Sequence, residues 1–96
     1  MAKGYVYAEI EVTNPERYRD YMAKSKGAVE AHGGRFLVRG GAPEVMEGDR
    51  RVTRVVIVEF DTIERARAFY HSAQYREAAA IRHESAVTHY YLLAGA

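Results

Sequence analysis

Hydrophobic and polar residues alternate near the start of the chain, which predicts a β-strand over residues 4–12. The hydrophobic positions are Val6, Ala8, Ile10 and Val12. The positions between them are Tyr5, Tyr7, Glu9 and Glu11. A period of two places these sets on opposite faces of a strand. The second face is not simply polar, because its two tyrosines are large and amphipathic.

Residues 15–32 carry the start signal, the apolar face and the stop signal of a helix. The Asn14 side chain can accept a hydrogen bond from a first-turn N–H, and Pro15 suits the first helical position. Helical spacing predicts one buried face, made of Tyr18, Tyr21, Met22, Ser25, Val29 and His32. Gly33 and Gly34 predict the end of the helix, since glycine accepts a left-handed backbone.

Two further strands are predicted over residues 35–47 and 51–60. The first is interrupted by the Gly-Gly-Ala-Pro run at 40–43, which indicates a bulge or an irregular loop before extended structure resumes at 44–47. Gly48 then indicates a turn. The second strand has hydrophobic residues on both faces, as expected of a strand covered on both sides. They are Val52, Val56, Val58 and Phe60 on one face and Val55 and Ile57 on the other.

A second helical segment is predicted over residues 62–83, and a last strand over 87–94. Asp61 and Glu64 have the spacing of a capping box, with Asp in place of the usual Ser or Thr. Ser72 indicates the cap of a further short helix within this segment. The apolar residues of the segment are Ile63, Ala66, Phe69 and Tyr70, followed by Tyr75, Ala78, Ala79 and Ile81.

The predicted order of elements is β-α-β-β-α-β, which places the chain in the α+β class. Its 96 residues make a single domain over 1–96, because chains split into domains only at greater length. Split β-α-β units build the ferredoxin-like sandwich. We therefore predict a four-stranded antiparallel sheet with the helices on one face.

The other face of the predicted sheet has no helix to cover it. It would present Tyr5, Tyr7, Val55, Ile57 and a row from the last strand. Monomeric proteins rarely leave an apolar patch of this kind in water. We therefore predict a homodimer in which two copies of this face meet across a twofold axis. The alternative is a monomer in which tyrosines and chain ends cover the sheet.

Composition excludes several classes of function. Lys and Arg number 14 against 13 Asp and Glu, a net charge of +1 with no basic stripe, so we expect no nucleic acid as a partner. The absence of cysteine excludes disulfide scaffolds and thiol catalysis. No apolar run approaches the length of a membrane span and no targeting segment is visible, so we expect no membrane partner and a cytoplasmic location.

Several short segments together give the chain a family resemblance that runs from Gly4 to Leu93. They are Gly4-Tyr5-Val6, Thr13-Asn14-Pro15-Glu16, the Gly-Gly-Arg-Phe-Leu-Val-Arg-Gly-Gly run at 33–41, Glu47-Gly48, Val58-Glu59-Phe60, and Ala68-Phe69-Tyr70-His71-Ser72 through Tyr75. On these residues the chain closely resembles the bacterial family catalogued as domain of unknown function 1330. One departure is Ala73, where members of the family often carry proline.

The resemblance implies a dimeric α+β barrel. Small monooxygenases, muconolactone-isomerase-like proteins and stress-responsive barrel domains use the same assembly. The family has no settled activity, so the resemblance supports the fold and the dimer rather than a particular chemistry.

A search for catalytic motifs finds only weak candidates. The four histidines lack metal-ligand spacing, and phosphate-loop and nucleophile motifs are missing, so we predict no metal and no cofactor. His32 ends the first helix, where it either caps the negative end of the helix dipole or serves as a general base. Glu9 needs a partner if its face is buried, and Arg54 is a candidate. The other interpretation of Glu9 is a catalytic acid with a raised pKa.

Four residues are candidates for binding a ligand. Arg39 precedes the glycines at 40–41, which leave space beside a long cation. Its guanidinium either grips a carboxylate through two parallel hydrogen bonds or forms a surface ion pair. Tyr70 and Tyr75 flank the junction of the second helix and the short helix, either as pocket walls or as core aromatics. Arg82 faces the same region or solvent.

Three classes of function follow from these candidates. The first, which we favour, is a binding protein with a pocket between the sheet and the second helix, in which Arg39 anchors a small aromatic or unsaturated carboxylic acid. The second is a cofactor-independent enzyme of the oxygenase or isomerase type, with His32 or Glu9 as proton acceptor in that cleft. The third is a structural module without an enclosed pocket.

Overall fold

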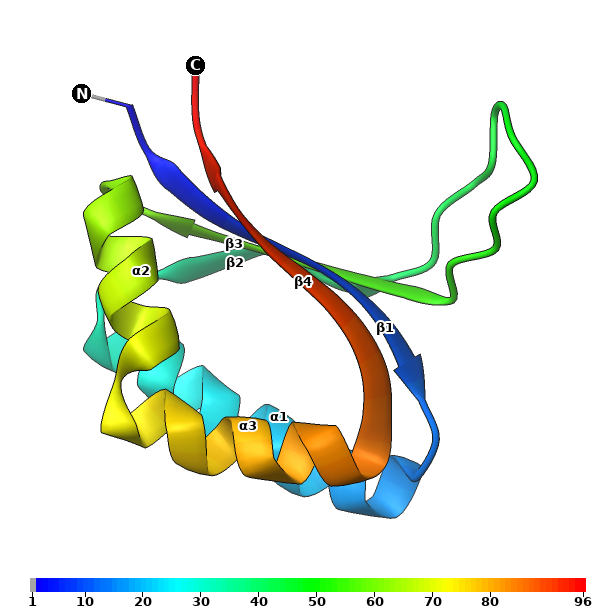
Figure 1. The fold of residues 1–96 in the computed structure, drawn as a ribbon, viewed down its shortest axis with the longest axis horizontal. Coiled ribbons are helices and arrows are strands. Elements are labelled where there is room, and N and C mark those ends of the chain that lie inside the picture. The colour runs from blue at the N-terminus through cyan, green and yellow to red at the C-terminus, as the bar shows by residue number, and fades with distance from the viewer. Residues whose placement is uncertain (1) are drawn as a thin grey trace.

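Seven helices and strands follow one another along residues 2–96, the part of the chain that the computed structural model describes (Figure 1). They are β1 (Gly4–Val12), α1 (Pro15–Ala31), β2 (Arg35–Gly41), β3 (Arg54–Phe60), α2 (Ile63–His71), α3 (Ala73–Ser85) and β4 (Ala86–Ala94). The strands form one antiparallel sheet in the order β2-β3-β1-β4. All three helices lie on one face of that sheet (Figure 1). The predicted α+β, ferredoxin-like fold is therefore confirmed.

Helix α1 begins and ends at the residues that the sequence predicts. The Asn14 side chain accepts a hydrogen bond from the backbone N–H of Arg17 at 3.1 Å. At the other end Gly33 has a φ of +74°, the left-handed conformation that glycine adopts without strain. The Gly34 N–H then bonds to the carbonyl of Val29 at 2.9 Å, which satisfies one of the last free carbonyls of the helix.

The second strand is shorter than predicted, and residues 42–53 contain neither helix nor strand. Gly40 has a φ of +94°, and the pairing of β2 with β3 shifts in register between Arg39 and Gly41. Pro43 comes shortly after the end of β2 and has no backbone N–H, so it cannot donate a hydrogen bond to a neighbouring strand. The expected return to extended structure at 44–47 is wrong, and the whole segment projects beyond the sheet (Figure 1).

The predicted helix over 62–83 is two helices separated by Ser72. The backbone of Ser72 is extended. Its hydroxyl donates a hydrogen bond to the carbonyl of Phe69 at 2.8 Å and accepts one from the N–H of Tyr75 at 3.1 Å. The expected role of Ser72 as the cap of the second helix is confirmed. The expected cap at Asp61 is wrong, because Thr62 accepts the N–H of Arg65 at 3.1 Å.

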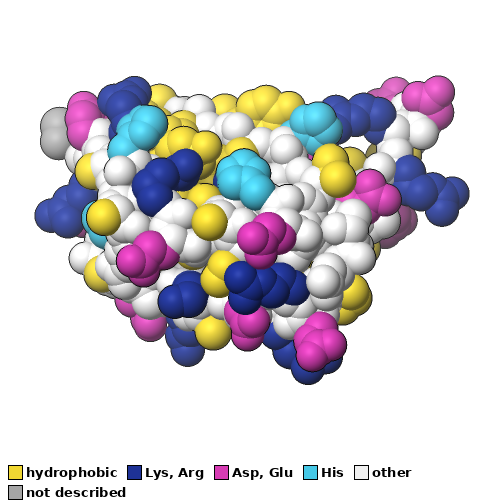
Figure 2. All heavy atoms as spheres, turned by 60° about the horizontal axis from the view of Figure 1, so that its bottom comes forward, with side chains coloured by type: hydrophobic (Ala, Val, Ile, Leu, Met, Phe, Trp, Pro, Cys, Tyr) yellow, Lys and Arg dark blue, Asp and Glu magenta, His cyan; other side chains and the backbone are white. Residues whose placement is uncertain are grey.

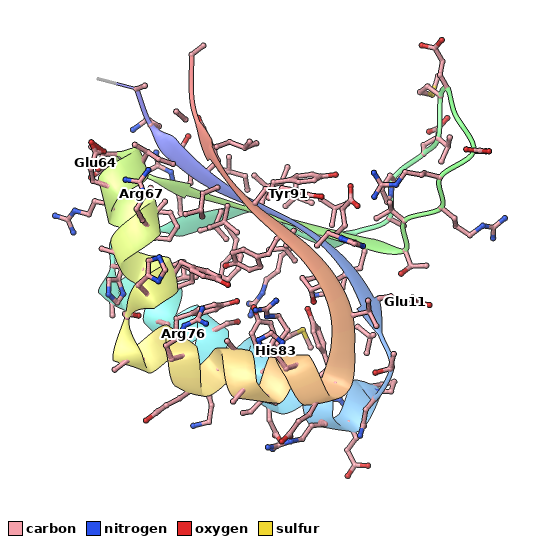
Figure 3. The ribbon with its side chains drawn as sticks, viewed as in Figure 1. Glu11, Glu64, Arg67, Arg76, His83 and Tyr91 are labelled. Carbon is pink, nitrogen blue, oxygen red and sulfur yellow. The ribbon has the colours of Figure 1, made fainter. Side chains whose placement is uncertain are left out.

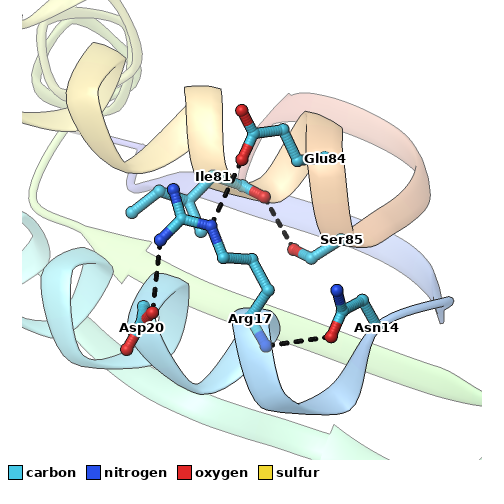
Figure 4. Close-up of polar contacts among 6 residues, drawn as sticks. All are labelled: Asn14, Arg17, Asp20, Ile81, Glu84 and Ser85. Carbon is cyan, nitrogen blue, oxygen red and sulfur yellow. Dashed lines mark hydrogen bonds and ion pairs between the residues drawn. The ribbon is translucent and has the colours of Figure 1, made fainter.

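Contacts between the ends of α1 and α3 tie the two long helices together (Figure 4). The Arg17 guanidinium reaches both Asp20 and Glu84, each at 3.2 Å. The Ser85 hydroxyl donates to the carbonyl of Ile81 at 2.7 Å within α3. The Ser85 carbonyl accepts the N–H of Asn14 at 3.1 Å, so the start of α1 is fixed against the end of α3.

The hydrophobic core lies between the helices and the sheet. Its largest fully buried side chains include Tyr75, Phe60, Phe69, Val6 and Val29. Figure 2 shows acidic and basic side chains interspersed over the outer side of the helices. None of the helices formed by residues 2–96 is both long and apolar enough to cross a membrane.

Candidate ligand-binding site

A small cavity lies inside the fold between the sheet and the helices. The space open to the centre of a water molecule is about 20 Å³, which is enough for about one water. Residues from all four strands and all three helices line it. They are Val6, Ala8, Ile10, Tyr18, Tyr21, Met22, Ser25, Val29, Phe36, Arg39, Arg54, Val56, Val58, Phe69, Tyr75 and Tyr90. Five of these residues come from α1, so the cavity lies largely beneath α1. The sequence analysis placed the pocket beneath the second helical segment.

Arg54 is one of two arginines in the cavity wall. It pairs with Ile10 across the sheet and lies on the helix-covered face of β3. Its guanidinium lies over the Tyr18 ring, 5.3 Å from the ring centroid, and one terminal nitrogen contacts the sulfur of Met22 at 3.4 Å. Its Nε is buried without a hydrogen-bond partner among the described residues. The expectation that Arg54 pairs with Glu9 is wrong, because the two side chains lie on opposite faces of the sheet.

Arg39 also lines the cavity, from the edge strand β2. Its guanidinium stacks over Phe36 at 4.3 Å from the ring centroid. One terminal nitrogen donates to the backbone carbonyl of Met22 at 2.8 Å, which links β2 to α1. The side chain is otherwise exposed, so Arg39 lies at the rim between the cavity and solvent.

Arg82 is the most deeply buried charged residue of the described chain, with 3% of its surface exposed. It lies over the ring of Tyr90, which lines the cavity, at 4.9 Å from the centroid. Its Nε is buried and has no hydrogen-bond partner within the described part of the chain. No ion pair formed within residues 2–96 includes Arg82, Arg54 or Arg39.

Three tyrosines that line the cavity, Tyr21, Tyr75 and Tyr90, are held in their neutral form. The hydroxyls of Tyr21 and Tyr75 are 2.8 Å apart and share a hydrogen bond. Burial raises the pKa values of Tyr21, Tyr75 and Tyr90 above the ordinary phenol value of about 10. Neutral phenols donate hydrogen bonds at neutral pH and do not accept protons there, so this cluster suits binding rather than proton abstraction.

Two of the four predicted ligand-binding residues line the cavity. Arg39 and Tyr75 are in its wall. Tyr70 lies behind the wall, with its ring 5.0 Å from that of Tyr90, and the Arg76 guanidinium covers it at 4.2 Å from the ring centroid. Arg82 lies behind Tyr90 in the same way. The sequence analysis missed Arg54 as a site residue, although the alternation of β3 places it in phase with Val56 and Val58.

The structure brings neither candidate proton acceptor to the cavity. The Nδ1 of His32 is 2.8 Å from the carbonyl of Ala28, and the His32 ring packs edge-on against Phe69. This contact fits a helix-end role. Glu9 lies on the helix-free face, where it accepts a hydrogen bond from the Tyr7 hydroxyl at 2.9 Å and pairs with Arg50. Among residues 2–96, no group of three or more His, Asp or Glu side chains gathers in a possible metal site.

The helix-free face carries two similar clusters, each of one tyrosine, one glutamate and one arginine. They are Tyr7, Glu9 and Arg50, and Tyr5, Glu59 and Arg35. The hydrogen bond from Arg35 lowers the pKa of Glu59, and the hydrogen bond to Glu59 raises the pKa of Tyr5. Glu59 is therefore held ionised beside an arginine and a phenol.

Comparison with known proteins places the chain in a family. Residues 3–96 match the family described as Domain of unknown function (DUF1330). The chain belongs to this family. No curated protein matches the DUF1330 chain significantly.

Solved structures resemble this DUF1330 protein in fold. A protein of unknown function from Rhodopseudomonas palustris is 18% identical, with a TM-score of 0.78 over 96% of this chain and 81% of that chain. SnoaB, a cofactor-independent oxygenase from Streptomyces nogalater, is 15% identical, with a TM-score of 0.70 over 97% and 92%. A dimeric ferredoxin-like protein of unknown function from Thermobifida fusca is 15% identical, with a TM-score of 0.64 over 97% and 91%.

Proposed function

We propose that this protein binds a small aromatic or unsaturated carboxylate in the cavity between the sheet and the helices. Arg54 and Arg39 hold the carboxylate, and Tyr75 forms part of the aromatic wall. The observation that carries the proposal is the pair of guanidiniums in the cavity wall, Arg39 and Arg54, neither of which forms an ion pair with a carboxylate of residues 2–96.

An unpaired cation is unfavourable in this environment. Removing a charge from water costs several kcal/mol unless an opposite charge and hydrogen bonds replace the lost solvation. The Nε of Arg54 is buried and lacks a partner. A planar carboxylate matches the donor geometry of a guanidinium, and it supplies both the missing charge and the missing acceptor.

Ligand binding requires the rim of the cavity to open. The space of about 20 Å³ is too small for an aromatic acid. Met22 and Arg39 close the rim through a single hydrogen bond between a backbone carbonyl and an exposed side chain. Methionine side chains change shape at low cost, and Arg39 lies on the edge strand, so this is the side from which a ligand enters.

We also propose that the protein is a homodimer through the helix-free face. In one copy, that face leaves three large hydrophobic residues of β4 exposed, namely Val87, Tyr91 and Leu93. Glu9 and Glu59 on this face already have arginine and tyrosine partners, so a second copy can cover them without leaving these two acids unpaired. The structural neighbour from Thermobifida fusca is described as dimeric, which supports the same assembly here.

A cofactor-independent enzyme is the alternative function. Support for it comes from the fold shared with the Streptomyces nogalater oxygenase. Abstracting a proton from a substrate requires a basic group within reach. The described residues that line the cavity include no Asp, Glu or His. The site geometry therefore favours binding over catalysis by the protein's own side chains.

Calorimetry with a matched acid and amide tests the proposed function. We expect cinnamate to bind and cinnamamide to bind much more weakly. Arg54→Met and Arg39→Met should each weaken cinnamate by about 1.5–3 kcal/mol, the range for a charge-assisted hydrogen bond, and leave cinnamamide unchanged. Arg67→Met is the control, because Arg67 is exposed on α2 away from the cavity (Figure 3). Equal losses for acid and amide, or no loss for the acid, would exclude these arginines from the site.

A further inference from the structure

We propose that the ligand of this site carries, in addition to its carboxylate, an oxygen that accepts a hydrogen bond from the Tyr21 hydroxyl. The ligand class is then a small aromatic or unsaturated acid with a hydroxyl or carbonyl group. This inference rests on the proposed function and goes further, because it assigns a second polar contact and the residue that makes it.

Two phenol hydroxyls meet inside the fold. Tyr21 of α1 and Tyr75 of α3 are 54 positions apart in the chain, and their hydroxyl oxygens are 2.8 Å apart. Both side chains line the cavity, and only 7% and 0% of their surfaces are exposed. The two hydroxyls therefore belong to the wall of the cavity and not to the outer surface.

The protons of this pair outnumber its hydrogen bonds. Each phenol keeps its proton at neutral pH, and a neutral phenol both donates and accepts. The bond between Tyr21 and Tyr75 uses one of the two protons, and the Tyr21 hydroxyl has no second hydrogen bond within residues 2–96. The Ser25 hydroxyl, one turn further along α1, donates to the carbonyl of Met22 at 3.2 Å. Buried donors are nearly always paired, so the remaining proton requires an acceptor.

The charge of Arg82 favours Tyr75 as the donor within the pair. The rings of Tyr90, Tyr75 and Tyr21 follow one another at centroid distances of 6.0 and 6.3 Å. The Arg82 guanidinium lies over Tyr90, at the first end of this row. A cation attracts hydroxyl oxygens and repels their protons, so the hydroxyl dipoles point away from it. Tyr75 therefore donates to Tyr21, and the proton of Tyr21 is the one that remains.

A short path along the cavity wall links Tyr21 to the carboxylate anchor. The Arg54 guanidinium lies over the Tyr18 ring at 5.3 Å from the centroid, and the rings of Tyr18 and Tyr21 are 5.2 Å apart. All three side chains line the cavity. One aromatic ring separates the guanidinium from the Tyr21 ring, so a ligand held at Arg54 extends along Tyr18 to Tyr21.

Calorimetry with matched hydroxyl and methyl ligands tests this inference. The probes are the ortho, meta and para isomers of hydroxycinnamate and of methylcinnamate. A methyl group has nearly the size of a hydroxyl group but accepts no hydrogen bond. We expect one hydroxy isomer to bind the native protein about fivefold more tightly than its methyl counterpart, which is within the range for one hydrogen bond.

Tyr21→Phe removes the hydroxyl and keeps the ring. In this variant we expect the favoured hydroxy isomer and its methyl counterpart to bind about equally, and the methyl ligand to bind as it does to the native protein. Tyr91→Phe is the matched control, because Tyr91 is exposed on the helix-free face, where it pairs with Tyr7. The preference for the hydroxy isomer should be unchanged in Tyr91→Phe.

The outcomes separate this inference from the proposed function. Binding of cinnamate without a preference for any hydroxy isomer would overturn the second contact and leave the proposed function standing. Failure of cinnamate and of all six probes to bind would overturn both. Equal losses for hydroxyl and methyl ligands in Tyr21→Phe would show that Tyr21 only shapes the wall. A preference that persists in Tyr21→Phe and disappears in Tyr75→Phe would overturn the assignment to Tyr21.

Discussion

Gly40 of β2 lies directly against the guanidinium of Arg54 in β3, with no room between them for a Cβ atom. The φ of Gly40 is +94°, which also disfavours any other residue. The space left by the missing side chain is therefore occupied by Arg54, whereas the sequence analysis assigned that space to Arg39. The break in β2 positions the main cation of the proposed site.

Gly40→Ala tests this relationship. The added methyl group would meet the Arg54 guanidinium and force a left-handed residue to carry a Cβ atom, which costs roughly 1–2 kcal/mol. We expect urea unfolding to show a loss of about that size, together with weaker binding of cinnamate. Gly41→Ala is the matched control, because a Cβ there meets only Val38, at 3.4 Å. Equal effects of the two substitutions would contradict the assigned role of Gly40.

Ile57→Lys tests the proposed dimer. Ile57 pairs with Tyr7 in the middle of the helix-free face. A lysine there would place an unpaired charge in the interface, and an uncompensated buried charge costs about 3–5 kcal/mol. We expect light scattering at micromolar concentration to show a dimer for the native protein and a monomer for Ile57→Lys. Lys24→Ala, an exposed position on α1, should remain dimeric. A native protein that is monomeric under these conditions would contradict the proposed assembly.

Alkaline titration tests the burial of the tyrosine cluster. Burial raises the pKa values of Tyr21, Tyr75 and Tyr90 in the folded state. In the unfolded chain these phenols lose their protons near pH 10, so above about pH 10 the unfolded state binds fewer protons than the folded state. The contribution of these phenols to the free energy of unfolding is therefore complete below about pH 10 and should be lost as the pH rises further.

The absorbance of tyrosinate near 295 nm measures this effect. We expect part of the absorbance of the eight tyrosines to appear only when far-UV circular dichroism reports unfolding. Complete ionisation of all tyrosines in the folded protein would contradict the burial of the cluster.

Ser72→Ala tests the break between α2 and α3. Alanine cannot accept the N–H of Tyr75, and loss of an N-cap costs about 1 kcal/mol. We expect thermal unfolding to show a lower Tm for Ser72→Ala and a Tm near the native value for Ser72→Asp, since aspartate also caps helices. An unchanged Tm in the alanine variant would show that the capping hydrogen bond does not stabilise the junction.

The fold was predictable from local patterns because most elements carry their own start and stop signals. Alternation located β1, and Asn14 and Gly33 bounded α1. The extent of β2 was not predictable in the same way. A run of extended residues becomes a strand only where a neighbour pairs with it, and pairing with β3 ends at Gly41.

The site was less predictable because it depends on contacts between distant segments. Arg39 drew attention through its neighbouring glycines, but Gly40 makes room for Arg54, which is fourteen positions away in the chain. Alternation alone places Arg54 on the helix-covered face with Val56 and Val58, whereas the sequence analysis considered Arg54 as a partner of Glu9 on the other face. The burial of Arg82 comes from packing against Tyr90 of β4, which no local pattern in α3 indicates.

Side-chain NMR of the arginines tests the central claim most directly. Buried Arg54 and Arg82 should give observable Nε–Hε signals, because their Nε atoms are shielded from water. We predict that cinnamate shifts the Arg54 signal in a saturable manner, whereas cinnamamide does not, and that the exposed Arg67 is unaffected by either compound. An Arg54 signal that stays in place when cinnamate is bound, or that moves equally with the amide, would contradict carboxylate recognition at this cavity.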